Sequence, residues 1–404
     1  MGRPRILILG ASRYYIYAIK IAKEMGYWTL AIDRNPNAPG LQLADEKEVV
    51  DITNIPAVID LAKKYKIDGI LALNDFGVQT AAEVSNRLGL PGLPLEVARV
   101  ATNKALMRKV WQGQSFNPEY RIVRTLEEAK RAVYELDHFP LIFKPADSRG
   151  GASRGVSCVF NEAQIEEAFT FAQSFYSNPD VVIEHYIEGL EHSLEAIVYR
   201  GEIYILAISD KVKTPLPYRV DKSVIYPTIL DGDTLANLEN TVKTAIELIG
   251  ITSGIVHVEL CTSSKGVFIF EMGARCGGGG TPYPIVPWVA GVNELEEAIR
   301  LAIGEPPKNY KPVTKKGCVY HFLTPKPGRL LAIYGLEEVR KWPGILDADV
   351  IVPVGGEVRP VRTGSDRAGF VIAGADTRQE ALILAGRAER EMKLITIQSN
   401  GLRK

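Results

Sequence analysis

The stretch Gly254–Gly280, GIVHVELCTSSKGVFIFEMGARCGGGG, holds the clearest information on fold and chemistry in this chain. Strict alternation over Ile255–Leu260 predicts a β-strand that carries Glu259. A turn-rich interval and a second apolar run, Val267–Phe270, predict the return strand of a hairpin that ends at Glu271. Because neighbouring strands place facing side chains side by side, the hairpin would bring these two carboxylates together.

Two carboxylates held together repel each other, and a cation between them removes the repulsion. Glu259 and Glu271 therefore predict a metal site, and Mg²⁺ suits it better than zinc, since no cysteine or histidine cluster has ligand spacing. Arg275 and the open backbone of Gly277–Gly280 follow directly, a combination that suits phosphate chemistry. An ordinary surface hairpin with acidic strand ends is the alternative explanation.

Composition limits the classes of partner. The 404 residues suggest two to four domains, and 46% hydrophobic with 24% charged residues is typical of a soluble globular protein. Lys and Arg (48) balance Asp and Glu (48), so the net charge favours neither nucleic acid nor membrane. No signal peptide and no long apolar stretch is evident, and the four cysteines form no C-x-x-C pair. We expect a cytoplasmic protein with reduced thiols.

The first hundred residues alternate strand and helix patterns. Apolar runs at residues 6–9, 28–32 and 70–73 are separated by helical patterns at residues 18–25, 56–64 and 78–88. This alternation predicts a doubly wound parallel sheet that ends near Leu90–Pro94. Gly10 lies where a phosphate loop would begin, but the G-x-G-x-x-G spacing is absent because Tyr14 and Tyr15 occupy it. A dinucleotide is therefore not expected, although a small-molecule pocket at the sheet edge is.

Two further segments suit an anionic ligand. A buried-looking strand, Leu141–Pro145, delivers Lys144 and is followed by a loop rich in glycine, serine and arginine over residues 146–156. Glycines let backbone N–H groups approach phosphate oxygens, although the loop lacks the G-K-[ST] of a Walker motif. Lys104 begins a short helical pattern, where a cation does not complement the helix dipole unless an anion is bound. A flexible hairpin loop and a solvated helix face are the alternatives.

A third segment suits a nucleoside. The extended run Val181–Gly189 could pair its backbone with a purine, and Glu191 could accept two ribose hydroxyls. A strand-turn-strand unit with exposed acids would explain the same residues.

Taken in order, these motifs resemble the ATP-grasp superfamily over about the whole chain. The resemblance implies an α/β and α+β protein with a Rossmann-like domain (1–100), an ATP-grasp domain (101–308, lid subdomain about 125–200) and a small α+β domain (309–404). It implies ATP as a ligand, held by Lys104, Lys144, Ser148, Gly150, Gly151, Ala152, Ser153, Glu184, His185, Tyr186, Ile187 and Glu191.

The resemblance also implies that Glu259 and Glu271 bridge Mg²⁺, or Mn²⁺, to the β- and γ-phosphates. Many members carry E-x-N here, whereas this chain has Gly273 in place of the asparagine, which leaves a second metal site incomplete. Arg275 and the glycines after it look like the substrate-side loop of amino-acid ligases and related carboxylate-amine ligases. There the arginine meets the transferred phosphate or the substrate carboxylate.

The implied activity is amide formation from a small-molecule carboxylate and an amine, with an amino acid as substrate. ATP would phosphorylate the carboxylate, and the amine would displace phosphate from the acyl phosphate, releasing ADP and phosphate. A homodimer is compatible with the resemblance. The alternatives are a purine-biosynthesis enzyme acting on a phosphoribosyl substrate and an ATP-binding protein without turnover.

Three smaller expectations complete the interpretation. Residues 209–227 lack a clear period and predict a substrate-facing loop with Lys211 as a catalytic residue, exposed hairpin charges being the alternative. Among the histidines, His257 faces the carboxylate side of its strand and is the candidate for the site. Near the end of the chain, Thr377 and Glu380 form an S/T-x-x-E capping box that begins the closing helix.

Overall fold

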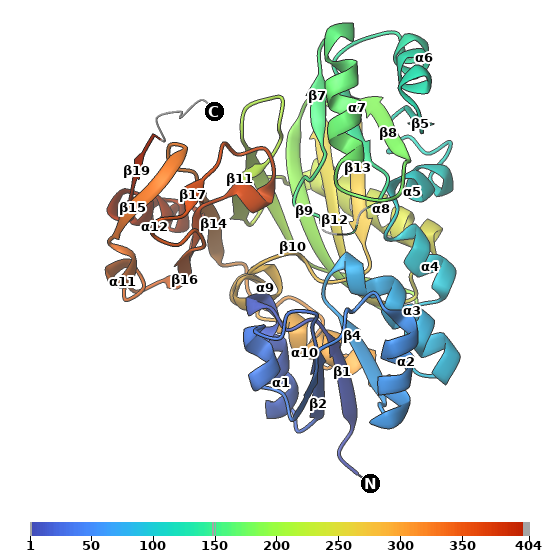
Figure 1. The fold of residues 1–404 in the computed structure, drawn as a ribbon, viewed down its shortest axis with the longest axis vertical. Coiled ribbons are helices and arrows are strands. Elements are labelled where there is room, and N and C mark those ends of the chain that lie inside the picture. The colour runs from blue at the N-terminus through green and yellow to red at the C-terminus, as the bar shows by residue number, and fades with distance from the viewer. Residues whose placement is uncertain (1, 148, 150, 399–404) are drawn as a thin grey trace.

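The computed structural model of the protein describes residues 2–147, 149 and 151–398. Its amino-terminal part is a parallel sheet in the order β3-β2-β1-β4 with helices around it (Figure 1). The elements are β1 (Arg5–Leu9), α1 (Ile16–Glu24), β2 (Trp28–Ile32), β3 (Glu46–Glu48), α2 (Ile55–Lys64), β4 (Gly69–Ala72) and α3 (Asp75–Leu88). The predicted parallel sheet is confirmed. Strand β3 was missed because its three residues are charged.

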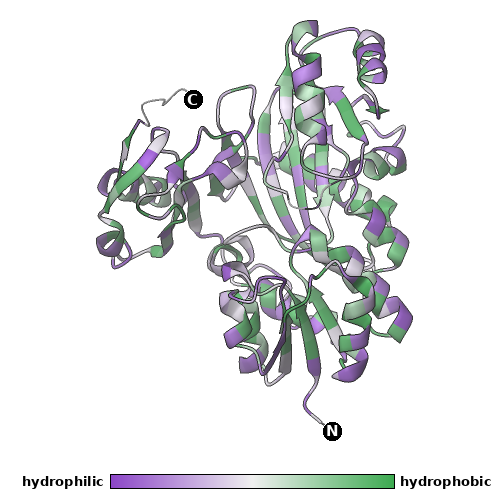
Figure 2. Cartoon of the chain, viewed as in Figure 1, coloured by the Kyte–Doolittle hydropathy of each residue, from purple (hydrophilic) through white to green (hydrophobic). Residues whose placement is uncertain are grey.

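Hydropathy explains why this sheet is buried. Strands β1, β2 and β4 of the amino-terminal sheet are largely hydrophobic, while the helices that cover it carry both hydrophobic and hydrophilic residues (Figure 2). Ile6, Leu7, Ile8 and Leu9 of β1 are all fully buried, because a central parallel strand is covered on both faces.

An antiparallel sheet in the order β5-β8-β6-β7 lies at the opposite end of the molecule from the amino terminus (Figure 1). Helices α6 and α7 pack on it around a core that includes Phe143 and Phe169. The elements are α4 (Leu95–Val100), α5 (Lys104–Val110), β5 (Tyr120–Val123), α6 (Leu126–Leu136), β6 (Leu141–Pro145), β7 (Ser157–Val159), α7 (Ile165–Gln173) and β8 (Val181–His185). The predicted strand that carries Lys144 is therefore confirmed as β6. We call residues 120–185 the lid.

A long sheet in the order β13-β12-β9-β10-β11-β14-β18-β16 runs through the rest of the molecule. Every neighbouring pair in it is antiparallel. Its strands are β9 (Leu190–Tyr199), β10 (Glu202–Lys213), β11 (Asp221–Tyr226), β12 (Ser253–Ser263), β13 (Gly266–Gly273), β14 (Gly317–Leu323), β16 (Ile345–Val350) and β18 (Gly369–Ala375). Because this sheet continues past residue 308, the proposed domain boundaries stay a prediction.

Alternation along β12 sets the two faces of this sheet. Val256, Val258 and Leu260 pack into a core with helix α8 (Gly232–Ile249), whereas Ile255 belongs to the core on the opposite face. Strands β12 and β13 form the predicted hairpin, with Glu259 directly opposite Glu271. The hairpin and the proximity of its carboxylates are therefore confirmed.

The remaining helices and strands follow the β12–β13 hairpin in the chain. They are α9 (Val286–Ala290), α10 (Glu294–Ala302), β15 (Gly328–Tyr334), α11 (Leu336–Val339), β17 (Glu357–Val358), α12 (Arg378–Glu391) and β19 (Lys393–Ile397). The capping box of Thr377 and Glu380 is confirmed at the start of α12. In the part of the chain that the structure describes, no helix is long and apolar enough to cross a membrane.

The prediction of a loop over residues 209–227 was wrong. Residues 209–213 belong to strand β10 and residues 221–226 form β11, so Lys211 lies within a sheet. The alternation of apolar and polar residues that predicts a strand is absent here, because the inward-facing side chains are charged and point into a buried ionic cluster. The connecting residues 214–220 are the part that forms a turn.

Close packing of α10 on β4 yields a stability prediction. A Cβ added at Gly69 would lie 2.2 Å from the carbonyl oxygen of Ala302, so the Gly69→Ala variant must separate the two elements. We expect the free energy of unfolding to fall by about 1–3 kcal/mol in chemical denaturation. Gly386→Ala in helix α12, where the nearest atom is 3.6 Å away, is the control and should not lose stability. Equal stability of Gly69→Ala and wild type would contradict this packing.

Candidate functional site

The two hairpin carboxylates are each paired with a lysine from another element. Lys211 Nζ on β10 lies 2.9 Å from Glu259 Oε1, and Lys104 Nζ at the start of α5 lies 3.0 Å from Glu271 Oε1. The side chains of the lysines are 3% and 8% exposed, whereas those of Glu259 and Glu271 are 37% and 20% exposed. The carboxylates therefore keep a side open to ligands while the lysines are enclosed.

The donor set fits a hard cation bound together with phosphate. Among the described residues no group of three or more His, Cys, Asp and Glu side chains is arranged to hold a metal ion. Glu259 and Glu271 would thus supply two oxygen ligands, and phosphate oxygens and water would supply the others, as is common for Mg²⁺.

The structure gives a steric reason for the glycine at position 273, where many ATP-grasp proteins carry asparagine. A Cβ at Gly273 would lie 3.2 Å from Asp75 Oδ1 and 3.2 Å from the guanidinium of Arg275. A longer side chain would therefore displace the ion pair between these two residues. The absence of a ligand at Gly273 follows from the space that this ion pair occupies.

A row of alternating charges continues from Lys211 across strands β9 to β11. Asp221 lies 3.7 Å from Lys211 and 2.8 Å from Lys213, and Lys213 lies 3.0 Å from Glu191. Arg219 closes the row at 2.7 Å from Glu191. Burial alone would raise the pKa of Asp221, but the two lysines outweigh burial and lower this pKa to about 2. Glu191 lies opposite Cys261 of β12, and its carboxylate is paired with Lys213 and Arg219.

A second buried cluster joins the lid to the long sheet. Glu184 on β8 pairs with Lys144 on β6 and with Arg108 on α5, whose Nε lies 2.8 Å away. Both cations also donate to the carbonyl oxygen of Phe270, next to Glu271 in the chain. Two cations face one carboxylate, so the cluster has excess positive charge. Burial lowers the pKa of Lys144 to about 8 although Glu184 and its hydrogen bond oppose the shift.

Arg275 makes a two-point contact with Asp75 of helix α3, which packs on the amino-terminal sheet. Its Nε lies 3.1 Å from Asp75 Oδ1, and a terminal nitrogen lies 2.9 Å from Asp75 Oδ2. Asp75 begins helix α3 and is buried. Sequence reasoning missed Asp75, because an acidic residue in the first turn of a helix needs no further explanation.

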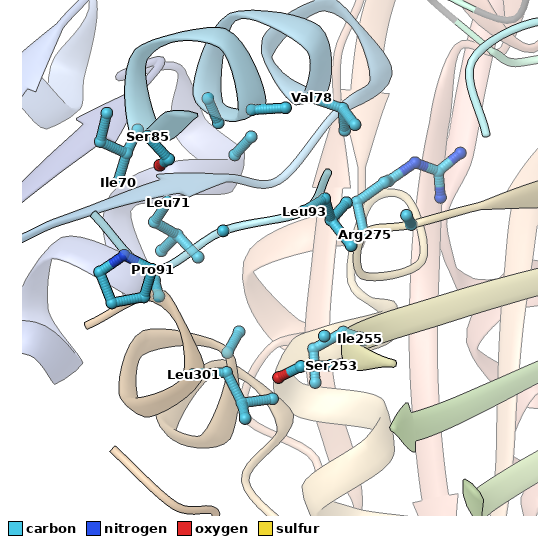
Figure 3. Close-up of a pocket in the computed structure, with 18 of the residues that line it drawn as sticks. Ile70, Leu71, Val78, Ser85, Pro91, Leu93, Ser253, Ile255, Arg275 and Leu301 are labelled. Atoms are coloured by element: carbon cyan, nitrogen blue, oxygen red, sulfur yellow. The ribbon is translucent and has the colours of Figure 1, made fainter. Parts of the chain in front are cut away.

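An apolar cavity of about 280 Å³ lies beside Arg275, between β4, α3, α10 and the start of β12. Leu71, Leu93, Ile255 and Leu301 are among the side chains that line it, and the guanidinium of Arg275 points away from them (Figure 3). The cavity therefore adjoins the site without containing its charged groups.

His257 lies on β12, one of the two strands of the hairpin, two residues before Glu259. Its Nδ1 is 2.6 Å from Glu195 Oε1 on β9, and its Nε2 is 3.7 Å from Glu259 Oε1. Burial would lower the pKa of His257, but Glu195 outweighs it and raises the pKa to about 9. Glu195 also accepts a hydrogen bond of 3.2 Å from the N–H of Gly277, so it connects the hairpin with the glycine run. Glu195 was missed because its strand, LEHSLEAIVY, gives no sign that an acid is buried.

Comparison with known proteins decides what this arrangement belongs to. Residues 137–282 match the family model of the ATP-grasp domain, and this range includes most of the lid and the whole β12–β13 hairpin. Residues 6–93 match the PylC-like amino-terminal domain, and residues 321–396 match the L-amino acid ligase C-terminal domain 2. The chain therefore contains an ATP-grasp domain. An ATP-grasp domain makes the protein an ATP-binding enzyme.

Several known proteins are similar to this chain over most of its length. An L-amino acid ligase from Bacillus licheniformis has the same fold, with a TM-score of 0.85 and 21% identity over 98% of this chain and 100% of that one. An uncharacterized protein of Sinorhizobium fredii is 26% identical over 84% of this chain and 71% of its own length. A formate-dependent phosphoribosylglycinamide formyltransferase of Sulfurisphaera tokodaii is 24% identical over 94% of each chain.

The structure positions the predicted ATP-grasp residues unequally around this site. Four of them lie together. Lys104 contacts Glu271 and Lys144 contacts the carbonyl oxygen of Phe270, both on β13, and Glu259 lies opposite Glu271. The Glu184 carboxylate instead faces Lys144 and Arg108, so its side chain is already paired.

The residues expected to hold the adenine base already make hydrogen bonds to backbone carbonyl oxygens within the protein. His185 Nε2 lies 2.9 Å from the carbonyl oxygen of Leu136, and the N–H of Tyr186 donates to Pro140 at 3.1 Å. The roles of these residues, of Ile187 and of Glu191 toward a nucleotide stay predictions.

The glycine-rich loop of this ATP-grasp domain is described in part. Gly151, Ala152 and Ser153 have positive φ values of 46°, 59° and 56°. Left-handed backbone at non-glycine residues is uncommon and is found at turns and ligand-binding loops. The predicted residues Ser148 and Gly150 lie outside the described residues.

The lowered pKa of Lys144 yields a pH prediction. Near pH 8.5 this lysine is partly neutral, and the negative charge of bound ADP would raise its pKa, so ADP binding should take up protons there. At pH 7 the lysine is already charged and the uptake should be small. Calorimetric titration in buffers of different ionisation enthalpy measures the uptake. It should vanish in Lys144→Met and persist in Lys130→Met, an exposed lysine of the same lid. Equal uptake in wild type and Lys144→Met would refute this role.

Proposed function

We propose that the protein is an ATP-dependent carboxylate-amine ligase that forms an amide through an acyl phosphate, with an amino acid as one substrate. The observation that carries this proposal is the pair Glu259 and Glu271, open on one side and enclosed by Lys104 and Lys211 on the other. The match of residues 321–396 to an L-amino acid ligase domain supports an amino acid as substrate. A cytoplasmic location and a homodimer are compatible with this proposal.

In the first step, an oxygen of the substrate carboxylate attacks the γ-phosphorus of ATP. The bond from this phosphorus to the β–γ bridging oxygen breaks, and ADP leaves. Lys104 and Lys144 would hold the phosphate charge, while Glu259 and Glu271 would hold Mg²⁺ or Mn²⁺, which neutralises developing charge when bound. Such a reaction needs positioning and charge neutralisation rather than a nucleophilic side chain.

In the second step, the amine nitrogen attacks the acyl carbon, the bond to the phosphate oxygen breaks, and the nitrogen loses a proton that the departing phosphate accepts. Lys211 is a poor acceptor for this proton. Burial would lower its pKa, but Asp221 and Glu259 outweigh burial and raise the pKa above its ordinary value. We therefore assign Lys211 to stabilising negative charge, in agreement with its place between two carboxylates.

Arg275 is the residue we assign to the substrate carboxylate or the transferred phosphate. Its guanidinium fork is occupied by Asp75 in this structure, and Asp75 shares the helix that lines the apolar cavity. A substrate carboxylate would have to compete with Asp75 or bind the outer edge of the guanidinium. We expect Arg275→Lys to lose activity because a single ammonium cannot make both contacts.

A purine-biosynthesis enzyme acting on a phosphoribosyl substrate is the second candidate. It is favoured by the similarity to formate-dependent phosphoribosylglycinamide formyltransferases, which extends over 94% of the chain. A phosphoribosyl group would require several cations at a second anion site, whereas an amino acid requires one carboxylate-binding arginine and an acceptor for its ammonium.

Release of ADP and phosphate from Mg-ATP, measured across a matrix of amino acids, amines and phosphoribosylglycinamide with formate, tests the proposal. We expect turnover that requires one amino acid and one amine. Glu271→Gln should reduce it by about 100-fold or more, because a charge-neutralising ligand is removed. The control Glu247→Gln changes an exposed glutamate of α8 and should be neutral.

The other outcomes separate the alternatives. Turnover with the phosphoribosyl substrate alone would replace the amino-acid proposal by the second candidate. Production of AMP and pyrophosphate would exclude the acyl-phosphate route. ATP binding without ADP formation in any mixture would favour a protein without turnover.

A further inference from the structure

The glycine-rich loop of the lid is bound to the carboxyl-terminal part of the chain. The N–H of Gly364 donates a 2.7 Å hydrogen bond to the carbonyl oxygen of Ala152. A terminal nitrogen of Arg154 donates to Ser365 Oγ at 3.0 Å. These contacts connect residues more than 200 positions apart in the chain. We call the turn Thr363–Asp366 the lid seat.

The lid seat is a preformed turn. Residues Gly364–Asp366 make one short helical turn, and Asp366 accepts hydrogen bonds from the N–H and the hydroxyl of Thr363 at 2.8 Å and 3.0 Å. Such a capping box satisfies the backbone of the turn without help from the lid. The backbone N–H of Gly364 is thus held in position for an incoming partner.

Close approach of the loop requires glycine in the lid seat. A Cβ added at Gly364 would lie 2.9 Å from Ala152 Cβ and 2.6 Å from a terminal nitrogen of Arg367. A larger side chain would therefore separate the lid seat from the loop. Gly364 combines this steric role with the hydrogen bond to Ala152.

A second contact between the lid and the rest of the molecule lies beside the lid seat. The ring of Phe171 on α7 meets Tyr218 edge to face at 5.6 Å, and the guanidinium of Arg362 lies 5.5 Å from the centre of the Tyr218 ring. The N–H of Cys158 donates to Pro217 at 3.0 Å. The lid therefore rests on the turn at residues 214–220 and on the lid seat together.

We propose that the lid seat positions the glycine-rich loop over the bound nucleotide, so that carboxyl-terminal residues control how long the nucleotide is held. This inference rests on the proposed nucleotide site. To open, the loop must break the Ala152–Gly364 and Arg154–Ser365 hydrogen bonds. Gly364 and Ser365 are thus positioning residues that act through the loop. A closed loop also keeps water away from a reactive acyl phosphate.

The test is the dissociation rate of fluorescent N-methylanthraniloyl-ADP with Mg²⁺, followed by stopped flow, because it needs no knowledge of the acid or amine. Gly364→Val and Arg154→Ala should each release the nucleotide about tenfold faster, the change expected from loss of one hydrogen bond. Arg131→Ala, which removes an exposed arginine from α6 of the same lid, should release it at the wild-type rate.

A reversible crosslink complements these variants in case one of them folds poorly. Cysteines at positions 152 and 364 are close enough to form a disulfide after a small shift of the loop. Oxidation of Ala152→Cys/Gly364→Cys should slow nucleotide release about tenfold, and reductant should restore it. Each single cysteine variant is the control.

The possible results separate a failure of the lid-seat role from a failure of the proposed function. Unchanged release in Gly364→Val and Arg154→Ala, or a crosslink that leaves release unchanged or does not form, would overturn the role of the lid seat alone. Failure of the wild-type protein to bind the nucleotide would overturn the proposed function and this inference with it.

Discussion

The ion pairs of Glu259 and Glu271 with Lys211 and Lys104 are the interactions on which the rest of the structure depends. Two facing carboxylates on neighbouring strands would repel, and two enclosed lysines would lose hydration, so each pair makes the other tolerable. Buried charge of this kind is a poor way to gain stability. It is well suited to holding side chains ready for a charged ligand.

These pairs also explain how distant parts of the chain converge. Lys144 and Glu184 belong to the lid, and Glu184 also pairs with Arg108 of α5. Arg275 pairs with Asp75 of helix α3 in the amino-terminal part. The excess positive charge at Lys144 lies beside the carbonyl oxygen of Phe270, the residue that precedes Glu271 in the chain. Negative phosphate, a divalent cation and the protein charges can therefore alternate, which is how a polyphosphate is held without strong net repulsion.

Sequence patterns predicted what depends on local periodicity. Alternation predicted the β12–β13 hairpin, and apolar runs predicted the parallel sheet. The capping box of Thr377 and Glu380 predicted the start of α12. Patterns could not supply partners that meet through folding. Asp75 and Arg275 are 200 residues apart, and neither is unusual in its own segment.

The strands around Lys211 were hidden for a related reason. Lysines and an aspartate point inward there, which contradicts the usual rule that inward positions are apolar. Such violations are expected at functional sites. The most direct measurement of the central claim is ADP affinity by titration with Mg²⁺ and with EDTA, in wild type and in Glu259→Gln/Glu271→Gln. Our account predicts that Mg²⁺ tightens binding in the wild type and not in the double variant, while equal affinity with and without Mg²⁺ in the wild type would contradict it.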